Sequence, residues 1–299
     1  MKKELGFVGL GRMGLNMTTN LIEQGYRVVG IDPSAEARAL AQEAGVEVVE
    51  TYAELASSLA PKRLVWVMVP SQFVDSVLTD LLPCLEKNDT IVDGGNSFYQ
   101  DSLKRHQNLK EKEINFLDCG TSGGVSGARY GASLMAGGSE EVFAEHEHVF
   151  QALATEDGYA LVGKAGAGHF VKMVHNGIEY GMMGAIAEGV NVLHEHSEQF
   201  DIDMQAVFKP YEHESIISSK LVSWLREAYE EGQIDLIKGE VPTGETESEM
   251  EHITTIGDVK VLEAALEQRK QTRDNPSYIG KLVAAMRNQF GGHKVIKKE

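Results

Sequence analysis

The sequence predicts an α/β protein in which a doubly wound parallel sheet occupies the first half and helices alone occupy the second. Three observations support this fold class. Short β-rich runs alternate with helical patterns, a glycine-rich turn directly follows the first run, and β-rich runs nearly disappear beyond Gly163. The 299 residues are enough for two modest domains. We therefore expect domains at 1–163 and 164–299.

The first half alternates strands with helices of the length that a parallel, doubly wound sheet requires. The expected strands are Leu5–Val8, Arg27–Ile31, Leu64–Val69, Thr90–Val92 and Asn115–Asp118, and helical patterns between them include Met13–Gln24, Ala35–Glu43 and Phe73–Leu82. In the second half, Ala167–His196 predicts one helix about 45 Å long. A helix of that length usually forms the spine of a domain or of a subunit interface. Further helices are expected at Glu214–Glu230, Val259–Gln271 and Tyr278–Asn288.

The composition excludes several function classes. With 28 basic and 45 acidic residues the net charge is −17, which repels nucleic acid and anionic membranes. No apolar run reaches the roughly 18 residues of a membrane span, and none has the form of a secretory signal. We therefore expect a cytoplasmic protein that acts on a small molecule. An anionic substrate would need a local basic island on this acidic chain.

The cysteines and histidines do not suggest a metal centre, and no metal is expected. Cys84 and Cys119 offer at most one disulfide and no plausible zinc set, so two reduced thiols are the simpler interpretation. His146 and His148 lie in a run of alternating glutamate and histidine, which we interpret as an exposed polar face.

A G-x-G-x-x-G pattern directly follows the first strand and opens the first helix, which is the context of a Rossmann-like dinucleotide site. The first glycine permits the tight turn, the second lets the backbone approach a pyrophosphate, and the third allows close packing of helix on strand. A glycine-rich surface turn is the alternative. The residues of the pattern are Gly9, Leu10, Gly11, Arg12, Met13 and Gly14.

Asp32 ends the second strand, 18 residues after Gly14, near the spacing expected for an acid that binds the cofactor ribose. Its carboxylate would accept hydrogen bonds from the ribose hydroxyls of NAD and repel the 2′-phosphate of NADP, so we expect NAD. The first basic residue after it, Arg38, comes later on a helix. The alternative role of Asp32 is a helix N-cap. Val69 and Pro70, at the end of a later strand, are expected to run beside the cofactor.

Lys172, His175, Asn176 and Glu179 have the spacing i, i+3, i+4 and i+7, which places them on one face of a helix. The lysine and the glutamate are two turns apart, about 10 Å along the axis, so a small polyol acid could bind between them. The alternative is a solvated polar stripe. Apolar neighbours such as Met173 and Val174 indicate instead a mostly buried helix, in which charged groups need a purpose or a partner.

Four segments carry a family resemblance. They are Asp93–Ser97 (D-G-G-N-S), the glycine-rich loop Gly120–Gly131, Gly168–Tyr180 (G-H-F-V-K-M-V-H-N-G-I-E-Y) and Arg287–His293 (R-N-Q-F-G-G-H). All four resemble segments of the short, NAD-dependent 6-phosphogluconate dehydrogenases, within the β-hydroxyacid dehydrogenase superfamily. The third is the most specific, because it fixes many chemically unlike residues at once.

The resemblance implies oxidative decarboxylation of 6-phosphogluconate by NAD⁺ to ribulose 5-phosphate and CO₂. It implies that Lys172 is the base for the hydroxyl proton and that Glu179 is the acid that protonates the enediol. A lysine base must be neutral near pH 7, and burial alone can lower a lysine pKa by roughly 3–5 units. The residues it places around the substrate are Asn96, Ser122, Gly123, Gly124, His175, Asn176 and Tyr180, with Asn96 also beside the cofactor.

The phosphate end of the substrate departs from the family pattern. The family has a basic residue in a Gly-x-Gly-Lys/Arg-Trp-Thr segment, where this chain has the acidic run Gly244–Glu249. Either the acidic run does not correspond to the family's basic segment, or the phosphate is held by Arg273, Arg287, His293 and their neighbours, or the substrate is another sugar acid or β-hydroxyacid. A non-catalytic NAD-binding sensor is the remaining alternative, against which the intact Lys172 and Glu179 argue.

The resemblance also implies a homodimer or homotetramer. Arg287 and His293 lie in the last 13 residues, which we expect to form a tail beyond the final helix. In the family such a tail enters the substrate site of the partner subunit. The long helix Ala167–His196 offers a surface for an obligate interface.

Overall fold

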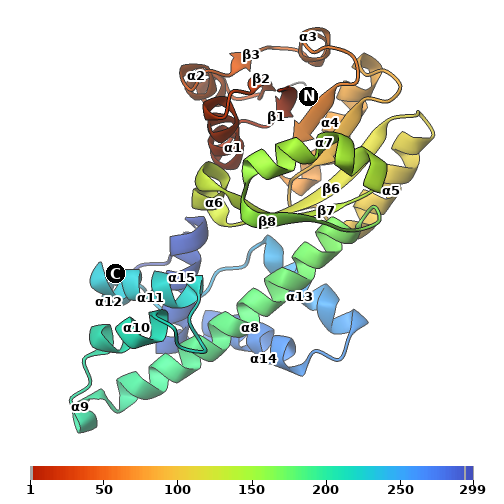
Figure 1. The fold of residues 1–299 in the computed structure, drawn as a ribbon. Coiled ribbons are helices and arrows are strands. Elements are labelled where there is room, and N and C mark those ends of the chain that lie inside the picture. Colours follow the sequence, from red (N-terminus) through yellow and green to blue (C-terminus); the bar gives the residue numbers. More distant parts are fainter. Residues whose placement is uncertain (1–2, 293, 299) are drawn as a thin grey trace. The chain divides into compact units, whose positions relative to one another are not determined.

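The computed structural model describes residues 3–292 and 294–298. The chain forms two compact units, Met1–Lys172 and Met173–Glu299, which we call unit 1 and unit 2. The helix α8 (Ala167–Glu195) contains the point where they join. Unit 1 combines one sheet with helices and unit 2 is mainly helical, which confirms the predicted fold class (Figure 1).

Unit 1 is built on a sheet with the strand order β3-β2-β1-β4-β5-β6-β7-β8. Neighbouring strands pair in parallel, except β6 and β7, which pair antiparallel. The chain steps outward from β1 to β3 and then returns to β4 on the other side of β1. Sheets with such a reversal bind ligands at the carboxyl ends of the strands flanking it. The strands are β1 (Glu4–Val8), β2 (Arg27–Ile31), β3 (Glu47–Val48), β4 (Leu64–Val67), β5 (Thr90–Asp93), β6 (Asn115–Ser122), β7 (Ala132–Gly137) and β8 (Ala154–Gly163).

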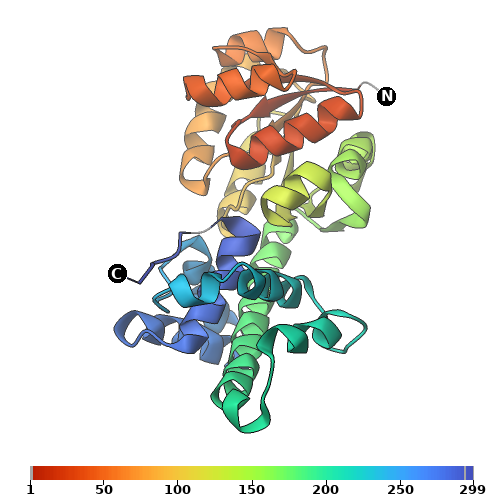
Figure 2. The ribbon, with the colours of Figure 1, turned by 90° about the vertical axis from the view of Figure 1, so that its left-hand side faces the viewer.

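Helices cover both faces of this sheet, because alternate residues of its central strands point to opposite sides and both sets are apolar. In β4, Leu64 and Trp66 join one core cluster, with α1 and α7, whereas Val65 and Val67 join another, with α4 and α5. On the first face α1 packs against α6 (Figure 2). The helices of unit 1 are α1 (Arg12–Glu23), α2 (Ala35–Glu43), α3 (Tyr52–Ser57), α4 (Ser71–Leu81), α5 (Tyr99–Lys110), α6 (Gly124–Tyr130) and α7 (Glu140–Leu153), with a 3₁₀ turn η1 (Leu82–Cys84).

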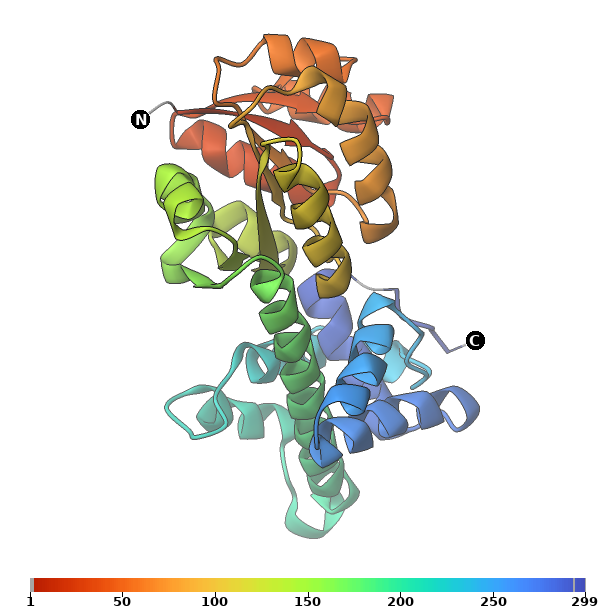
Figure 3. The same cartoon turned by 90° about the vertical axis from the view of Figure 1, so that its right-hand side faces the viewer.

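Unit 2 is organised around α8, which supplies Tyr180, Met183 and Ala187 to its buried core (Figure 3). The predicted helix Ala167–His196 ends one residue early, and α11 begins at Lys220 rather than Glu214. Although α8 has 29 residues, no described helix is both long and apolar enough to cross a membrane. The other helices are α9 (Ser197–Phe200), α10 (Met204–Glu212), α11 (Lys220–Glu230), α12 (Gln233–Leu236), α13 (Glu245–Ile256), α14 (Lys260–Asp274) and α15 (Tyr278–Gly291).

The exposed face expected at His146 and His148 is wrong. His146 is 6% exposed on the inner side of α7, and its Nε2 atom lies 2.9 Å from Oγ1 of Thr90. His148 is half-buried and stacks on the ring of Tyr26. Burial lowers the pKa of His146 from 6.5 to about 4.

We expect acid to destabilise unit 1 through His146. The pKa of His146 is lower in the folded than in the unfolded protein. Its contribution to the free energy of unfolding is therefore fully present above about pH 6.5 and is lost as the pH falls towards 4. The loss should reach about 3 kcal/mol, measured as the free energy of urea unfolding across that range. His146→Gln should lose this part of the pH dependence, whereas a change of the exposed His213 to Gln should keep it. Equal pH dependence in both variants would contradict the assignment.

Candidate active site

The glycine-rich turn joins β1 to α1 at the carboxyl end of the strand. Gly9 has a φ of +96°, which favours glycine, and a side chain there would collide with the backbone that follows β4. A side chain on Gly14 would collide with the carbonyl of Gly9, so α1 approaches β1 closely only because both are glycine. Gly11 faces open space, and α1 begins with Arg12 and Met13. Its first N–H groups are therefore available to a phosphate.

Asp32 lies beside this turn. Its Oδ2 atom accepts a hydrogen bond of 2.7 Å from the backbone N–H of Leu10, and its Oδ1 atom accepts one of 2.8 Å from Ser34. The N-cap of α2 is Ser34, whose hydroxyl accepts from Ala37, so the alternative role of Asp32 as the cap is wrong. Its carboxylate is thus fixed by the glycine-rich turn, at the carboxyl end of β2.

The chain that leaves β4 passes next to the same turn. A side chain on Gly9 would meet the Cγ1 atom of Val69 at 2.8 Å, and one on Gly95 would meet the Val69 carbonyl at 2.8 Å. Pro70 follows as the N-cap residue of α4, and the predicted strand ends two residues early, at Val67. Val69 therefore lies between the turns that follow β1 and β5.

Asn96 lies in the turn after β5, which a buried carboxylate holds in place. Asp93 accepts hydrogen bonds from the Gly95 N–H at 3.3 Å and from the Ser97 hydroxyl at 2.7 Å. Arg105, from α5, donates to Asp93 at 3.1 Å and is 5% exposed. Asn96 itself is half-buried. Hydrogen bonds to Asp93 thus fix the turn that contains Asn96.

Ser122, Gly123 and Gly124 follow on from the next strand of the sheet. Strand β6 continues past the predicted Asp118 and ends at Ser122, and α6 begins at Gly124. Gly123 has a φ of +118°, which allows the sharp entry into α6. The predicted turns after β1, β5 and β6 all lie in unit 1.

Lys172 lies against β6. It is 8% exposed, and a side chain on Gly120 would collide with its Cβ atom, so only glycine at this position leaves room for the lysine stem. Asp118, fully buried on the same strand, accepts hydrogen bonds from the N–H groups of Gly166 at 2.5 Å and His169 at 2.9 Å. This carboxylate holds the first turn of α8, where the positive end of the helix dipole favours it.

His169 links the same turn of α8 to the Asn96 turn. One ring nitrogen, Nδ1, lies 2.7 Å from the Ser102 hydroxyl and the other, Nε2, lies 3.1 Å from the Gly95 carbonyl. The side chain is nearly fully buried. Sequence reasoning gave no role to His169, Asp118 or Gly120, because their contacts join segments that are far apart in the chain.

The remaining predicted residues of α8 belong to unit 2. Asn176 is 4% exposed and donates to a carboxylate oxygen of Glu249 at 2.7 Å. The Nδ1 atom of His175 lies 3.8 Å from Oε2 of Glu179. Tyr180 is 4% exposed, and its hydroxyl accepts a hydrogen bond from Thr246 at 3.0 Å. Two carboxylates, a histidine and an amide are therefore gathered along this part of the helix.

Two arginines share a backbone acceptor in the core of unit 2. Arg269 is 2% exposed and stacks over the Tyr180 ring, 4.7 Å from its centroid. Arg287 is 3% exposed, and both guanidinium groups donate to the carbonyl of Pro242 at 3.0 Å. The Nε atoms of both have no hydrogen-bond partner among the described residues. Burial lowers the pKa of Arg269, and the positive charge of Arg287 lowers it further.

The acidic run that departs from the family pattern is mostly helical. Residues Glu245–Ile256 form α13, and Glu247 on this helix is paired with arginines of α14. It accepts two hydrogen bonds of 3.0 Å from Arg273 and lies 3.5 Å from Nε of Arg269. Arg269 was not predicted as a site residue, although it lies four residues before Arg273 on one helix, a spacing that shares a face.

The expected C-terminal tail is wrong for Arg287. This residue lies on α15, which continues to Gly291, and its guanidinium group contacts Pro242 of its own chain. Arg287 therefore belongs to the final helix and not to a tail beyond it. His293, the other residue predicted in the tail, lies outside the described residues.

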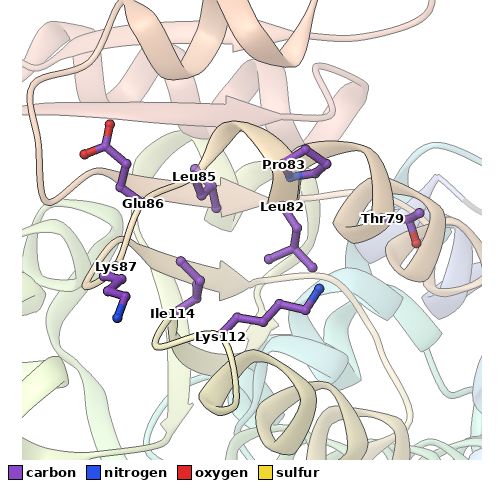
Figure 4. Close-up of a pocket in the computed structure, with 8 residues that line it drawn as sticks. All are labelled: Thr79, Leu82, Pro83, Leu85, Glu86, Lys87, Lys112 and Ile114. Carbon is purple, nitrogen blue, oxygen red and sulfur yellow. The ribbon is translucent and has the colours of Figure 1, made fainter.

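A separate hollow of about 740 Å³ opens on unit 1 (Figure 4). Glu86 and Lys87 line it just before β5, and Lys112 and Ile114 line it just before β6. It therefore lies at the amino ends of these parallel strands, whereas the predicted cofactor residues lie at the carboxyl ends. It is not part of the candidate active site.

Comparisons with known proteins identify the family of this chain. Residues 4–166 match the NAD binding domain of 6-phosphogluconate dehydrogenase, and residues 168–240 match its C-terminal domain. YqeC of Bacillus subtilis, provisionally named a 6-phosphogluconate dehydrogenase, is 41% identical over 99% of this chain and 100% of its own. A protein of Haloferax volcanii named as an NAD(+)-dependent, decarboxylating 6-phosphogluconate dehydrogenase is 38% identical over 99% of both chains. The 6-phosphogluconate dehydrogenase of Plasmodium falciparum, solved with NADP+ and with 6-phosphogluconate, has a TM-score of 0.83 at 28% identity, covering 91% of this chain and 62% of that one.

Proposed function

We propose that this chain, which belongs to the 6-phosphogluconate dehydrogenase family, catalyses the NAD⁺-dependent oxidative decarboxylation of 6-phosphogluconate. Membership of the family makes it an oxidoreductase, and the substrate and the cofactor are what we propose. The observation that carries the proposal is the set Lys172, His175, Asn176 and Glu179 on one face of α8. These residues supply a proton acceptor and a proton donor from a single helix.

The turn after β1 and the Asp32 carboxylate fit a nicotinamide dinucleotide. Side chains on Gly9 or Gly14 would fill the space that lets backbone and helix come close, and Asp32 stands where ribose hydroxyls need an acceptor. The negative charge of Asp32 favours NAD⁺ over NADP⁺. When bound, the cofactor supplies the hydride acceptor for the alcohol oxidation.

In the proposed reaction Lys172 acts first. Its Nζ atom takes the proton of the C3 hydroxyl while that carbon gives up its hydride, which leaves a β-keto acid. The resulting ammonium group gives its proton to the new carbonyl oxygen as the bond to the carboxylate breaks, so CO₂ leaves and the electron pair stays on the carbon skeleton as an enediol. Glu179 then donates a proton to the carbon that lost CO₂ while Lys172 takes up the enediol hydroxyl proton, which leaves the ketone ribulose 5-phosphate.

The buried arginines of unit 2 support a phosphorylated substrate. Arg269 and Arg287 are buried and Arg273 is half-buried, and among the described side chains the carboxylate paired with these three positive charges is that of Glu247. A buried excess of positive charge is costly unless an anion joins it. A phosphate dianion beside Tyr180 and Thr246 would offer acceptors to Arg269 and Arg287, whose Nε atoms make no hydrogen bond to the described residues, although Nε of Arg269 lies 3.5 Å from Glu247.

Replacing Arg269 by Met tests the substrate. The protein should convert 6-phosphogluconate and NAD⁺ to ribulose 5-phosphate, CO₂ and NADH, and Arg269→Met should lower kcat/KM for it by about 10- to 100-fold through a higher KM. Turnover of unphosphorylated gluconate should change little. Arg226→Met, on the surface of the same unit, is the matched control. An equal loss with both acids would show that Arg269 does not recognise the phosphate.

The pair of Glu247 with Arg273 favours one other candidate, the oxidation of an unphosphorylated sugar acid. In that case the carboxylate of Glu247 would supply the negative charge that a substrate phosphate supplies otherwise. Turnover of the two substrates by the wild-type protein decides between these candidates. A kcat/KM that is higher for gluconate than for 6-phosphogluconate would favour the unphosphorylated sugar acid.

We also propose that the chain forms a homodimer or homotetramer through α8. On the part of this helix that lies in unit 2, three large apolar side chains are exposed, with Ile178 at 52%, Met182 at 42% and Val192 at 55%. Their separations of 4 and 10 residues repeat one face of the helix. A second copy of the same helix would cover this stripe with a matching one.

A further inference from the structure

Arg38 is held next to Asp32 by the backbone that leaves β2. Its Nη1 atom donates to the carbonyl of Asp32 at 2.7 Å and to that of Pro33 at 3.1 Å. The side chain is half-buried on α2, one turn after the Ser34 cap. Two main-chain acceptors therefore fix its guanidinium group at the carboxyl end of β2, where the cofactor ribose is expected. Its Nε and Nη2 groups donate no hydrogen bond to any described acceptor.

We propose that Arg38 is a specificity-determining residue, a preformed binding group for the 2′-phosphate of NADP⁺ whose use the neighbouring Asp32 carboxylate prevents. A guanidinium group with free N–H groups is the side chain best suited to bind a phosphate. A 2′-phosphate bound to Arg38 would lie beside the Asp32 carboxylate. The two negative charges would repel each other and weaken the binding of NADP⁺. The proposal rests on the proposed function only in that the site binds a nicotinamide dinucleotide.

Other charged groups near this end of β2 do not take the same role. Glu36 is exposed on α2, two residues before Arg38, a spacing at which helix side chains point in different directions. Arg12 is the first residue of α1, next to the turn where a pyrophosphate would bind, so it serves NAD⁺ and NADP⁺ alike. Asp32 is held by Leu10 and Ser34 and cannot move away without breaking both bonds. Of these groups, Arg38 is therefore the positive one whose binding would differ between the two cofactors.

The test measures nucleotide binding, so it does not depend on turnover. Asp32→Asn keeps an oxygen to accept from Leu10 but removes the charge, and it should tighten NADP⁺ binding in calorimetry by at least about tenfold. Adding Arg38→Met should abolish that gain and leave the Kd for NAD⁺ within about twofold of the Asp32→Asn value. Arg27→Met, at the opposite end of β2 and paired with Glu47, is the control for a general loss of positive charge.

The 2′-phosphate itself is isolated by comparing 2′,5′-ADP with 5′-AMP as probes. In Asp32→Asn the diphosphate should bind at least about tenfold more tightly, and Arg38→Met should remove this difference while Arg38→Lys keeps part of it. An unchanged difference in Arg38→Met would overturn the proposal, as would an Asp32→Asn protein that gains no affinity for NADP⁺. A wild-type protein that binds neither dinucleotide would refute the proposed function as well, so the two failures are distinguishable.

Discussion

Lys172→Met is expected to reduce kcat by about 100- to 10,000-fold while the affinity for NADH stays nearly unchanged. A positioned general base typically contributes that factor, and the methionine has no group that can take a proton. It does have a stem of similar length, so it can fill the space that Gly120 leaves against β6. The measurements are steady-state turnover with 6-phosphogluconate and NAD⁺, and NADH binding by fluorescence.

The control is Lys164→Met, at an exposed lysine just before α8, which should keep wild-type turnover. A Lys172→Met protein with more than about a tenth of the wild-type kcat would exclude a lysine base. Loss of NADH binding together with turnover would instead indicate that the change disturbs the first turn of α8. Asp118 and His169 hold that turn, so its disruption should also lower the thermal stability of unit 1.

The glycine-rich turn and the face of α8 could be predicted because both depend on local spacing. A G-x-G-x-x-G pattern between a strand and a helix specifies backbone geometry within six residues, and the positive φ of Gly9 agrees with it. Likewise the spacing of Lys172 and Glu179 fixes a shared helix face without any tertiary information. This shared face requires only that the segment is helical, and burial of its apolar residues stabilises the helix.

The last strands of the sheet could not be predicted from hydrophobic alternation. Strand β8 (Ala154–Gly163) pairs only with β7 and is mostly exposed or half-buried, so its sequence lacks a clear buried face. Strand β7 (Ala132–Gly137) consists mainly of small residues, which have weak strand preference. Pairing with β6 decides its structure.

The arginine group of unit 2 was only partly predictable, because tertiary contacts create it. The acidic run that begins after Gly244 lacks the basic residue of the family pattern, yet Glu247 in this run is paired with Arg273 of α14. Arg269 gains its significance from Tyr180 and Pro242, which lie far away in the sequence. His146 is a different case. Phe143 and Phe150 share its helix face, so the burial that was missed could have been found from spacing.

In the proposed mechanism Glu179 donates a proton to the enediol carbon after CO₂ has left. Glu179 is partly buried, with its side chain 19% exposed, and His175 lies 3.8 Å from its carboxylate on the preceding turn of α8. Glutamine has the same shape and can keep a hydrogen bond at this position, but it has no proton to give at any accessible pH. Replacing Glu179 by Gln therefore separates the chemistry of the group from its packing.

Glu179→Gln should slow the formation of ribulose 5-phosphate by about 100-fold or more, because the enediol loses its proton donor. In a single turnover, NADH should still appear at close to the wild-type rate, since oxidation precedes the step that needs Glu179. Glu195→Gln, at an exposed position near the end of the same helix, should leave both rates unchanged. If Glu179→Gln slowed NADH formation as much as ketopentose formation, Glu179 would act before or during the oxidation, and its assignment as the acid for the enediol would be wrong.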